Sequence, residues 1–200
     1  MDIYGKYRPA MEEVLQYLAG RVEENGKSEN GEKLYEHLSL RIKSDESMRE
    51  KLQRKGLEEN EKNALQVLKD AIGMRVVCLF VDDVYECVQR IRNFERLKVL
   101  EEKDYILDAK PNGYRSYHMI VEVTSDEEDV DGNVPGHFYA EIQLRTIAMD
   151  TWAALEHELK YKKNISNQEM IIQELHRCAN DLAACDVSMQ TLRKIIRQIP

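Results

Sequence analysis

Several features are missing from the sequence, and each absence narrows the class of protein. No apolar run approaches the roughly 20 residues that span a bilayer, and the first residues lack the apolar stretch of a signal peptide. We therefore expect a cytoplasmic protein that is not associated with a membrane. Internal repeats and low-complexity tracts are also missing, so we expect residues 1–200 to form a single domain with a sizeable core.

The four cysteines lack the spacing of a metal site. Cys78, Cys87, Cys178 and Cys185 form no CxxC motif and have no histidine nearby at metal-binding spacing. We interpret all four as buried, reduced thiols, and we predict no zinc site.

An excess of basic residues is lacking too. The chain has 29 Lys and Arg residues against 37 Asp and Glu residues, which gives a formal net charge of −8. A general nucleic-acid binder needs a broad basic surface to face phosphate backbones, so we do not expect nucleic acid as a partner. A small anionic substrate held by a local basic patch remains compatible with this charge.

Two short motifs look like ligand sites but are incomplete. Gly26-Lys27-Ser28 resembles the end of a phosphate-binding P-loop, yet the position that needs a glycine holds Arg21. The acidic stretch 125–136 resembles a calcium loop, but the glutamate of an EF-hand would fall on Phe138. We interpret both stretches as ordinary loops.

Hydrophobic periodicity predicts a mixed α/β (α+β) fold with a sheet of about four to five strands, flanking helices and a long C-terminal helix. The predicted strands are 74–81, 98–101, 116–124 and 137–145. The predicted helices are 8–24, a short one within 38–55 capped at Ser44 or Ser47, one ending near Asp70, 83–94, 146–162 and a tail over 166–199. In the helix over 146–162, Trp152, Leu155 and Leu159 are expected to pack inward.

The C-terminal tail has its own pattern. A capping box, Ser166-x-x-Glu169, opens it. Apolar residues then repeat with heptad spacing, a pattern typical of helix pairing. These residues are Leu175, Cys178, Leu182, Cys185, Met189, Leu192 and Ile196. A stripe of this kind either packs on the chain's own domain or pairs with a second copy.

The most informative stretch is AKPNGYRSYHMIVEV, residues 109–123, in which a turn signal leads into a strand. A hairpin needs only the Asn-Gly pair. The additional groups Lys110, Tyr114, Arg115 and His118 therefore indicate a flat or charged ligand.

Strand alternation gathers polar side chains on one face of the predicted hairpin. They are Ser116 and His118 on the first strand and Glu141, Gln143 and Arg145 on the second. Such a face often simply meets water. The chemical variety of the set favours a site instead, because Asp70 and Glu141 near lysines and arginines would suit Mg²⁺ and nucleotide phosphates.

These motifs carry a family resemblance. KPNGYRSYH followed by AEIQLRTIAMDTWAALEHELKYK closely resembles the synthetase domain of the RelA/SpoT family, over a catalytic core of roughly residues 38–162. The chain length and the lack of a hydrolase-type His-Asp motif point to the small alarmone synthetase class. The resemblance implies a nucleotidyltransferase-like fold, Mg²⁺ as cofactor, and transfer of pyrophosphate from ATP to the 3′-hydroxyl of GDP or GTP. The product would be ppGpp or pppGpp, the signal of the stringent response.

The resemblance also implies roles for individual residues. On the ATP side, adenine would pack on Arg41 and Arg75, and the phosphates would be held by Lys43, Lys51 and Arg54. On the GDP or GTP side, Tyr114 would stack on guanine, and the pocket would be completed by Lys110, Ser116, His118, Gln143 and Arg145. Asp70 and Glu141 match the magnesium carboxylates, and Glu141 also matches the catalytic base. Trp152 and His157 fit the family pattern, and we interpret them as structural.

Some questions stay open from the sequence. The segment Glu101-Glu102-Lys103-Asp104 mixes the basic and acidic forms found in the family, so the preference between GDP and GTP is undetermined. A toxin-type relative acting on tRNA or adenine nucleotides, and a non-catalytic nucleotide-binding protein, are the alternative functions. The resemblance and the heptad stripe together predict a homo-oligomer, with a tetramer favoured. We expect the C-terminal tail at the interfaces, and the 8–24 helix is a second candidate for an interface.

Overall fold

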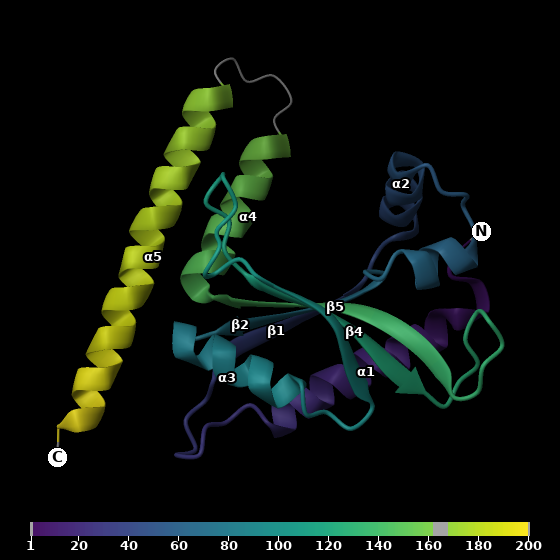
Figure 1. The fold of residues 1–200 in the computed structure, drawn as a ribbon, viewed down its shortest axis with the longest axis horizontal. Helices are drawn as coiled ribbons and strands as arrows, with labels where there is room; N and C mark the ends of the chain where they lie inside the picture. The colour runs from purple at the N-terminus through teal and green to yellow at the C-terminus, as the bar shows by residue number, and fades with distance from the viewer. Residues whose placement is uncertain (1, 162–167, 200) are drawn as a thin grey trace.

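The computed structural model describes residues 2–161 and 168–199, which form a five-stranded mixed sheet with flanking helices (Figure 1). The strands are β1 (Tyr35–Ile42), β2 (Ile72–Cys78), β3 (Leu97–Asp104), β4 (Tyr117–Ser125) and β5 (Gly136–Thr146). The helices are η1 (Gly5–Tyr7), α1 (Arg8–Glu24), α2 (Asp45–Lys55), η2 (Asn63–Val67), α3 (Val81–Ile91), α4 (Ile147–Tyr161) and α5 (Gln168–Gln198). The predicted fold class is confirmed.

The sheet order is β1-β2-β5-β4-β3, in which only the β2–β5 pair is parallel. Buried and half-buried residues alternate strictly along β4, and along β5 as far as Leu144, so one face of the sheet is buried. Helices α1 and α3 cover that face, as Figure 1 shows below the strands. Met11, Val14 and Leu18 of α1 are fully buried there and form part of the main core.

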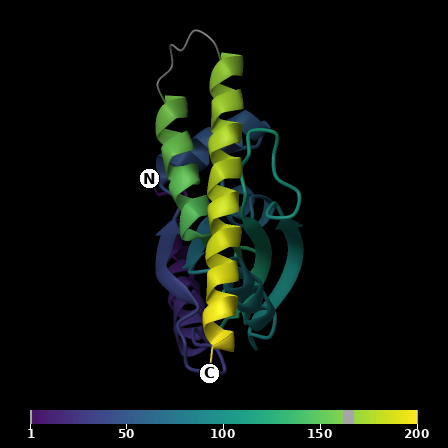
Figure 2. The ribbon, with the colours of Figure 1, turned by 90° about the vertical axis from the view of Figure 1, so that its left-hand side faces the viewer.

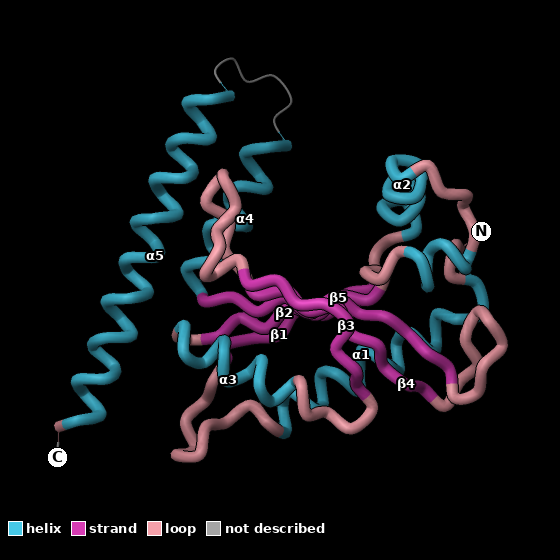
Figure 3. The backbone as a smooth tube through the Cα atoms, viewed as in Figure 1, coloured by secondary structure: helices cyan, strands magenta, loops and turns pink. Residues whose placement is uncertain are grey.

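The opposite face of the sheet carries polar side chains and is flanked by α2 at one end and α4 at the other (Figure 3). Helix α2 begins where sequence chemistry predicted, because the Ser44 side chain accepts a hydrogen bond from the Ser47 N–H. Helix α5 runs alongside α4 and past the end of the sheet (Figure 2). Thr146 attaches it to the end of β5, with its hydroxyl donating to Asp186 at 2.6 Å.

Two elements near the N-terminal half differ from the prediction. Strand β1 was not predicted, because apolar and polar residues alternate only over positions 38–42 of YEHLSLRI and none of its residues is fully buried. The helical segment expected to end near Asp70 ends earlier, at Val67, since Leu68 already has extended backbone geometry. Asp70 therefore lies in the turn before β2 and not in a helix.

The packing predicted for α4 is partly wrong. Trp152 is buried, but Leu155 and Leu159 are 58% and 43% exposed. They lie on the outer side because α4 packs through one narrow stripe against α5 and does not sink into the main core. The predicted capping residue Ser166 lies outside the described residues.

The cysteine prediction is also only half right. Cys78 and Cys87 are buried free thiols, with sulfur atoms 3.9 Å apart, whereas Cys178 and Cys185 are exposed free thiols on α5. Most of the heptad stripe on α5 is exposed with them. Leu175 and Leu182 instead pack near Trp152, because α5 buries the face that carries these two residues and Ala179.

No described helix is both long enough and apolar enough to cross a membrane.

Candidate active site

Two rows of side chains cross the polar face of the sheet through all five strands. The first row, in register, is Arg41, Gly73, Glu141, Ile120 and Glu101, and the second is Ser39, Arg75, Gln143, His118 and Lys103. The arginines lie at the β1–β2 end, and a larger pocket lies at the β3 end. Glu141, on the central strand β5, lies between them. We call the two ends the arginine end and the β3 end.

The arginine end has a small pocket of about 20 Å³ lined by Arg41, Gly73 and Arg75 among others. Arg41 and Gly73 are cross-strand partners. A Cβ on Gly73 would lie 3.4 Å from both Cγ and Nε of Arg41, an ordinary van der Waals contact, so the Arg41 side chain packs closely over β2. The two predicted adenine-binding arginines are therefore brought to one pocket.

Beyond this pocket, two lysines converge on one carboxylate. Lys43 and Lys51 both donate to Asp70 Oδ2, with Lys51 Nζ at 2.5 Å. Burial alone would raise the pKa of Asp70, but the lysine hydrogen bonds lower it below its ordinary value. Burial lowers the pKa of Lys43. Arg54 lies one turn beyond Lys51 on α2 and is exposed.

Asp70 also fits a divalent metal. Its second oxygen, Oδ1, is buried and has no hydrogen-bond partner among the described residues. A buried carboxylate oxygen needs a partner, and Mg²⁺ takes one or two carboxylates together with phosphate oxygens and water. Within the described residues, no cluster of three or more acidic, histidine or cysteine side chains forms a metal cage. The residues present thus fit a metal that is shared with a substrate.

At the centre of the face, Glu141 belongs to a chain of hydrogen bonds. His118 Nδ1 lies 3.1 Å from Glu141 Oε1, and the Gln143 amide donates to Glu141 Oε2 at 3.0 Å. Burial would raise the pKa of Glu141, but these bonds lower it below its ordinary value. Glu141 is therefore ionised at neutral pH.

This chain of hydrogen bonds continues through the side chain of Tyr114. Its hydroxyl lies 2.7 Å from His118 Nε2 and accepts a hydrogen bond from Arg145 at 2.6 Å. Arg145 also donates to Ser116 and to the Gln143 side-chain oxygen. Ser116 and Arg145 are buried, so the structure places these two predicted pocket residues beneath Tyr114 as supports.

The β3 end holds a pocket of about 270 Å³. Its lining residues are Glu101, Lys103, Tyr105, Lys110, His118, Ile120 and Glu141. The Lys110 ammonium lies 4.5 Å from the Tyr105 ring centroid and 4.7 Å from that of Tyr114. Two predicted residues, Lys110 and His118, therefore line a space that also contains Tyr105, which was not predicted.

The mixed segment on β3 is sorted by strand alternation. Glu101 and Lys103 line the pocket and form an ion pair at 2.6 Å. Glu102 points to the other side, where Arg92 and the Tyr117 hydroxyl donate to it. Asp104 accepts a hydrogen bond from the Tyr85 hydroxyl. Only two members of the segment thus face a ligand in this pocket.

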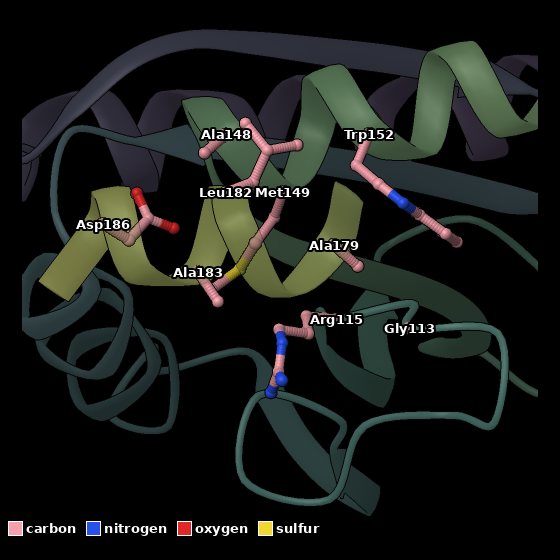
Figure 4. A pocket seen from close by; sticks show the side chains of 9 residues that line it. All are labelled: Gly113, Arg115, Ala148, Met149, Trp152, Ala179, Leu182, Ala183 and Asp186. Atoms are coloured by element: carbon pink, nitrogen blue, oxygen red, sulfur yellow. The ribbon is translucent and has the colours of Figure 1, made fainter. Parts of the chain in front are cut away.

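The turn before β4 is held by the C-terminal helices. Gly113 has φ +90°, and a Cβ there would lie 2.5 Å from the Cβ of Ala179 on α5. Figure 4 shows Gly113 and Ala179 among the residues that line a cavity between the turn, α4 and α5, whose volume is about 10 Å³. Trp152 links α5 to the turn. Its indole N–H donates to the Leu175 carbonyl, and its ring contacts the Tyr114 ring edge-on.

Sequence reasoning missed two residues of the site. Tyr105 directly follows β3, which was predicted to end at residue 101. The face of the sheet on which its side chain lies was therefore not assigned. Asp150, in the first turn of α4, contacts both Arg75 and Arg145. Its position in the AMDTW motif was the available signal, but nothing in the spacing showed its partners.

Comparison with known proteins places the chain. Residues 40–166 match the family model described as the region found in RelA / SpoT proteins. The chain is 39% identical over 165 residues to GTP pyrophosphokinase YwaC of Bacillus subtilis (strain 168), which covers 82% of this chain and 77% of that protein.

Two solved structures from Bacillus subtilis agree in fold over nearly the whole chain. Small alarmone synthetase 2 has a TM-score of 0.79 at 35% identity, covering 92% of this chain and 95% of that one. Small alarmone synthetase 1, bound to its product pppGpp, has a TM-score of 0.79 at 29% identity, covering 97% and 95%. The chain therefore belongs to the RelA/SpoT family, and its fold matches that of the family's small alarmone synthetases.

Proposed function

We propose that this chain is a GTP pyrophosphokinase, an alarmone synthetase of the stringent response. It transfers pyrophosphate from ATP to the 3′-hydroxyl of GDP or GTP and releases AMP. The observation that carries the proposal is the pair of side-chain rows, which joins a cationic end and a larger pocket through Glu141. A relative solved with the product pppGpp supports it.

The arginine end suits ATP. Arg41 and Arg75 offer planar guanidinium groups to adenine, and a guanidinium stays charged and stacks well on aromatic faces. Lys51 and Arg54 lie on α2, Lys43 lies between β1 and α2, and the three supply positive charge to the phosphates. When ATP binds, its phosphates take over part of the role of Asp70 as counter-ion to the two lysines.

The β3 end suits the guanine nucleotide. Tyr105 lines the pocket, and Tyr114 lies beside it with the Lys110 ammonium over both rings, so these two rings provide aromatic surface for the base. Lys110 and His118 face the phosphates and ribose. Gln143, Ser116 and Arg145 keep Tyr114 and Glu141 in place. The pocket volume of about 270 Å³ is close to that of ordinary small-molecule sites.

Asp70, whose Oδ1 has no hydrogen-bond partner among the described residues, and Glu141 would hold Mg²⁺. The chemistry that the metal would supply is neutralisation of phosphate charge and polarisation of the phosphoryl oxygens. The chain's own residues align the reactants, which is the main demand of phosphoryl-type transfer.

In the reaction, Glu141 accepts the proton of the 3′-hydroxyl. The hydroxyl oxygen forms a bond to the β-phosphorus of ATP, and the bond from that phosphorus to the oxygen bridging the α-phosphate breaks. AMP leaves with that oxygen. The lowered pKa of Glu141 keeps it in the basic form that this step needs. ATP and guanine nucleotides are cytoplasmic substrates, and we place the enzyme there.

One incubation tests the proposal. The full chain is mixed with Mg²⁺ and γ-labelled ATP, and with GDP, GTP, AMP or tRNA in separate reactions. Label should move to GDP or GTP with release of AMP. Label on tRNA or AMP instead would favour the toxin-type alternative, and no labelled product with any divalent metal would contradict enzymatic pyrophosphate transfer.

We also propose that the chain is a homo-oligomer, with a tetramer favoured, α5 at an interface and α1 as a second candidate. The exposed apolar stripe on α5 supports this, and it comprises Cys178, Cys185, Met189, Leu192 and Ile196. Light scattering on the intact chain and on Leu192→Glu tests it, with Glu158→Gln on α4 as a surface control. A monomeric mass for the intact chain at micromolar concentration would contradict the proposal.

A further inference from the structure

Arg75 and Arg145 meet at a single carboxylate oxygen. Asp150 Oδ1 lies 3.2 Å from an Nη1 atom of Arg75 and 3.1 Å from that of Arg145. Asp150 sits in the first turn of α4, and its side chain is 20% exposed. One acidic group on a helix outside the sheet therefore holds together two basic groups from neighbouring strands.

The two arginines belong to different halves of the site. Arg75 lines the small pocket at the arginine end. Arg145 is not among the residues that line that pocket, and it donates to the Tyr114 hydroxyl. Asp150 thus connects the proposed ATP pocket with the proposed guanine-stacking residue, through an ion pair with Arg75 and the hydrogen bonds of Arg145.

The electrostatics explain why an acid is needed there. Burial and the nearby positive charge of Arg145 both lower the pKa of Arg75, and Asp150 opposes that effect. Arg145 is only 6% exposed on its side chain, so it cannot rely on water as its counter-charge. Without the carboxylate, the two guanidinium groups would repel each other and move apart.

We propose that Asp150 is a positioning residue that fixes the separation of the two nucleotide sites and makes their occupancies mutually dependent. The inference rests on the proposed function, which assigns Arg75 to ATP and Tyr114 to the acceptor. Closure of Arg75 on adenine pulls on Asp150, and Arg145 passes that displacement to Tyr114. Groups that share a partner in this way show coupling energies, and such coupling is reciprocal.

The test compares Asp150→Asn with Glu158→Gln, which makes the same charge change at an exposed position on the same helix. The KM values for ATP and GDP are measured with Mg²⁺, and the dissociation constant of a non-hydrolysable ATP analogue is measured with and without GDP. Asp150→Asn should raise both KM values on the order of tenfold, as expected for losing a charged hydrogen bond. GDP should change analogue binding in the wild type but not in this variant, and Glu158→Gln should match the wild type.

A purely structural Asp150 gives a different result. It would lower the melting temperature and the active fraction, with both KM values and the analogue–GDP coupling of the folded fraction unchanged, and that result would overturn the proposal. If Asp150→Asn does not fold, Asp150→Glu keeps the charge and displaces the oxygen by one methylene. Wild-type coupling in that variant would also overturn the proposal, and a changed coupling supports it. A wild type without transferase activity refutes the proposed function instead, whereas an active wild type with unchanged variant coupling refutes only this inference.

Discussion

The hydroxyl and the ring of Tyr114 are expected to serve separate purposes, and two substitutions separate them. Tyr114→Phe removes the hydroxyl that contacts Arg145 at 2.6 Å and His118 at 2.7 Å. Because Arg145 is buried, the loss leaves a charged donor without its partner. A hydrogen bond to a charged group contributes about 1.5–3 kcal/mol to the free energy of unfolding. For a chain of this length, that lowers the melting temperature by roughly 3–12 °C.

Tyr114→Ala removes the ring as well. Stacking of a base on an aromatic side chain is worth about 1–3 kcal/mol, which corresponds to a roughly 5- to 150-fold rise in the KM for GDP or GTP. The phenylalanine variant keeps the ring, so its acceptor KM should rise only a few-fold. In both variants the KM for ATP should change much less than that of the acceptor.

The assays are urea unfolding and initial-rate kinetics with each substrate varied in turn. Tyr17→Phe is a matched control, because the Tyr17 hydroxyl accepts a hydrogen bond from the Arg96 N–H far from the pocket. It should lower stability modestly and leave both KM values unchanged. Equal rises of both KM values in Tyr114→Ala, or a Tyr114→Phe protein as stable as the wild type, would refute this reasoning.

Three further predictions concern the carboxylates and the turn. Asp70→Asn should abolish transfer. Urea unfolding should also show a loss of about 1–3 kcal/mol in the free energy of unfolding, because two half-buried lysines lose their counter-ion. Full transferase activity in this variant would show that Asp70 is not part of the site. The folded-state pKa values of Asp70 and Glu141 lie below their ordinary values of 3.8 and 4.5, so their stabilisation is complete above those values and is lost as the pH falls below them. Glu141→Gln should therefore flatten the fall in unfolding free energy between pH 5 and 3, and an unchanged slope contradicts this account. Gly113→Ala should raise the acceptor KM and lower the melting temperature, since the added methyl would overlap α5 and strain a backbone with positive φ; an unaltered KM would show that the turn is not held as described.

The β4–β5 pair shows what the sequence could establish. Strict alternation assigned Tyr117, Met119 and Ile142 to the buried face and His118 and Glu141 to the polar face, and all of them lie there. Alternation works here because one face packs on α1 and α3, which leaves a strong apolar signal. Helix α1 was predicted with the correct bounds for the same reason.

Other parts were hidden because their signals are tertiary. Strand β1 is an edge strand with weak burial, and its apolar and polar residues alternate only over positions 38–42, which is a weak signal. Leu155 and Leu159 look like core residues, but α4 packs mainly on α5, with smaller contacts to β2 and β5, and buries a narrower stripe than a central helix. Ser116 and Arg145 support Tyr114 because they are buried and Arg145 donates to its hydroxyl. The spacing of residues in the sequence does not show this burial or this contact.

The contact between Trp152 and Tyr114 has a practical consequence. Trp152 is the only tryptophan of the chain, and its ring centroid lies 6.2 Å from that of Tyr114. Any nucleotide that stacks on Tyr114 therefore changes the surroundings of the single indole in the protein. The intrinsic fluorescence of the unlabelled chain becomes an optical signal for acceptor occupancy, and titration with GDP or GTP alone separates that event from ATP binding and from catalysis.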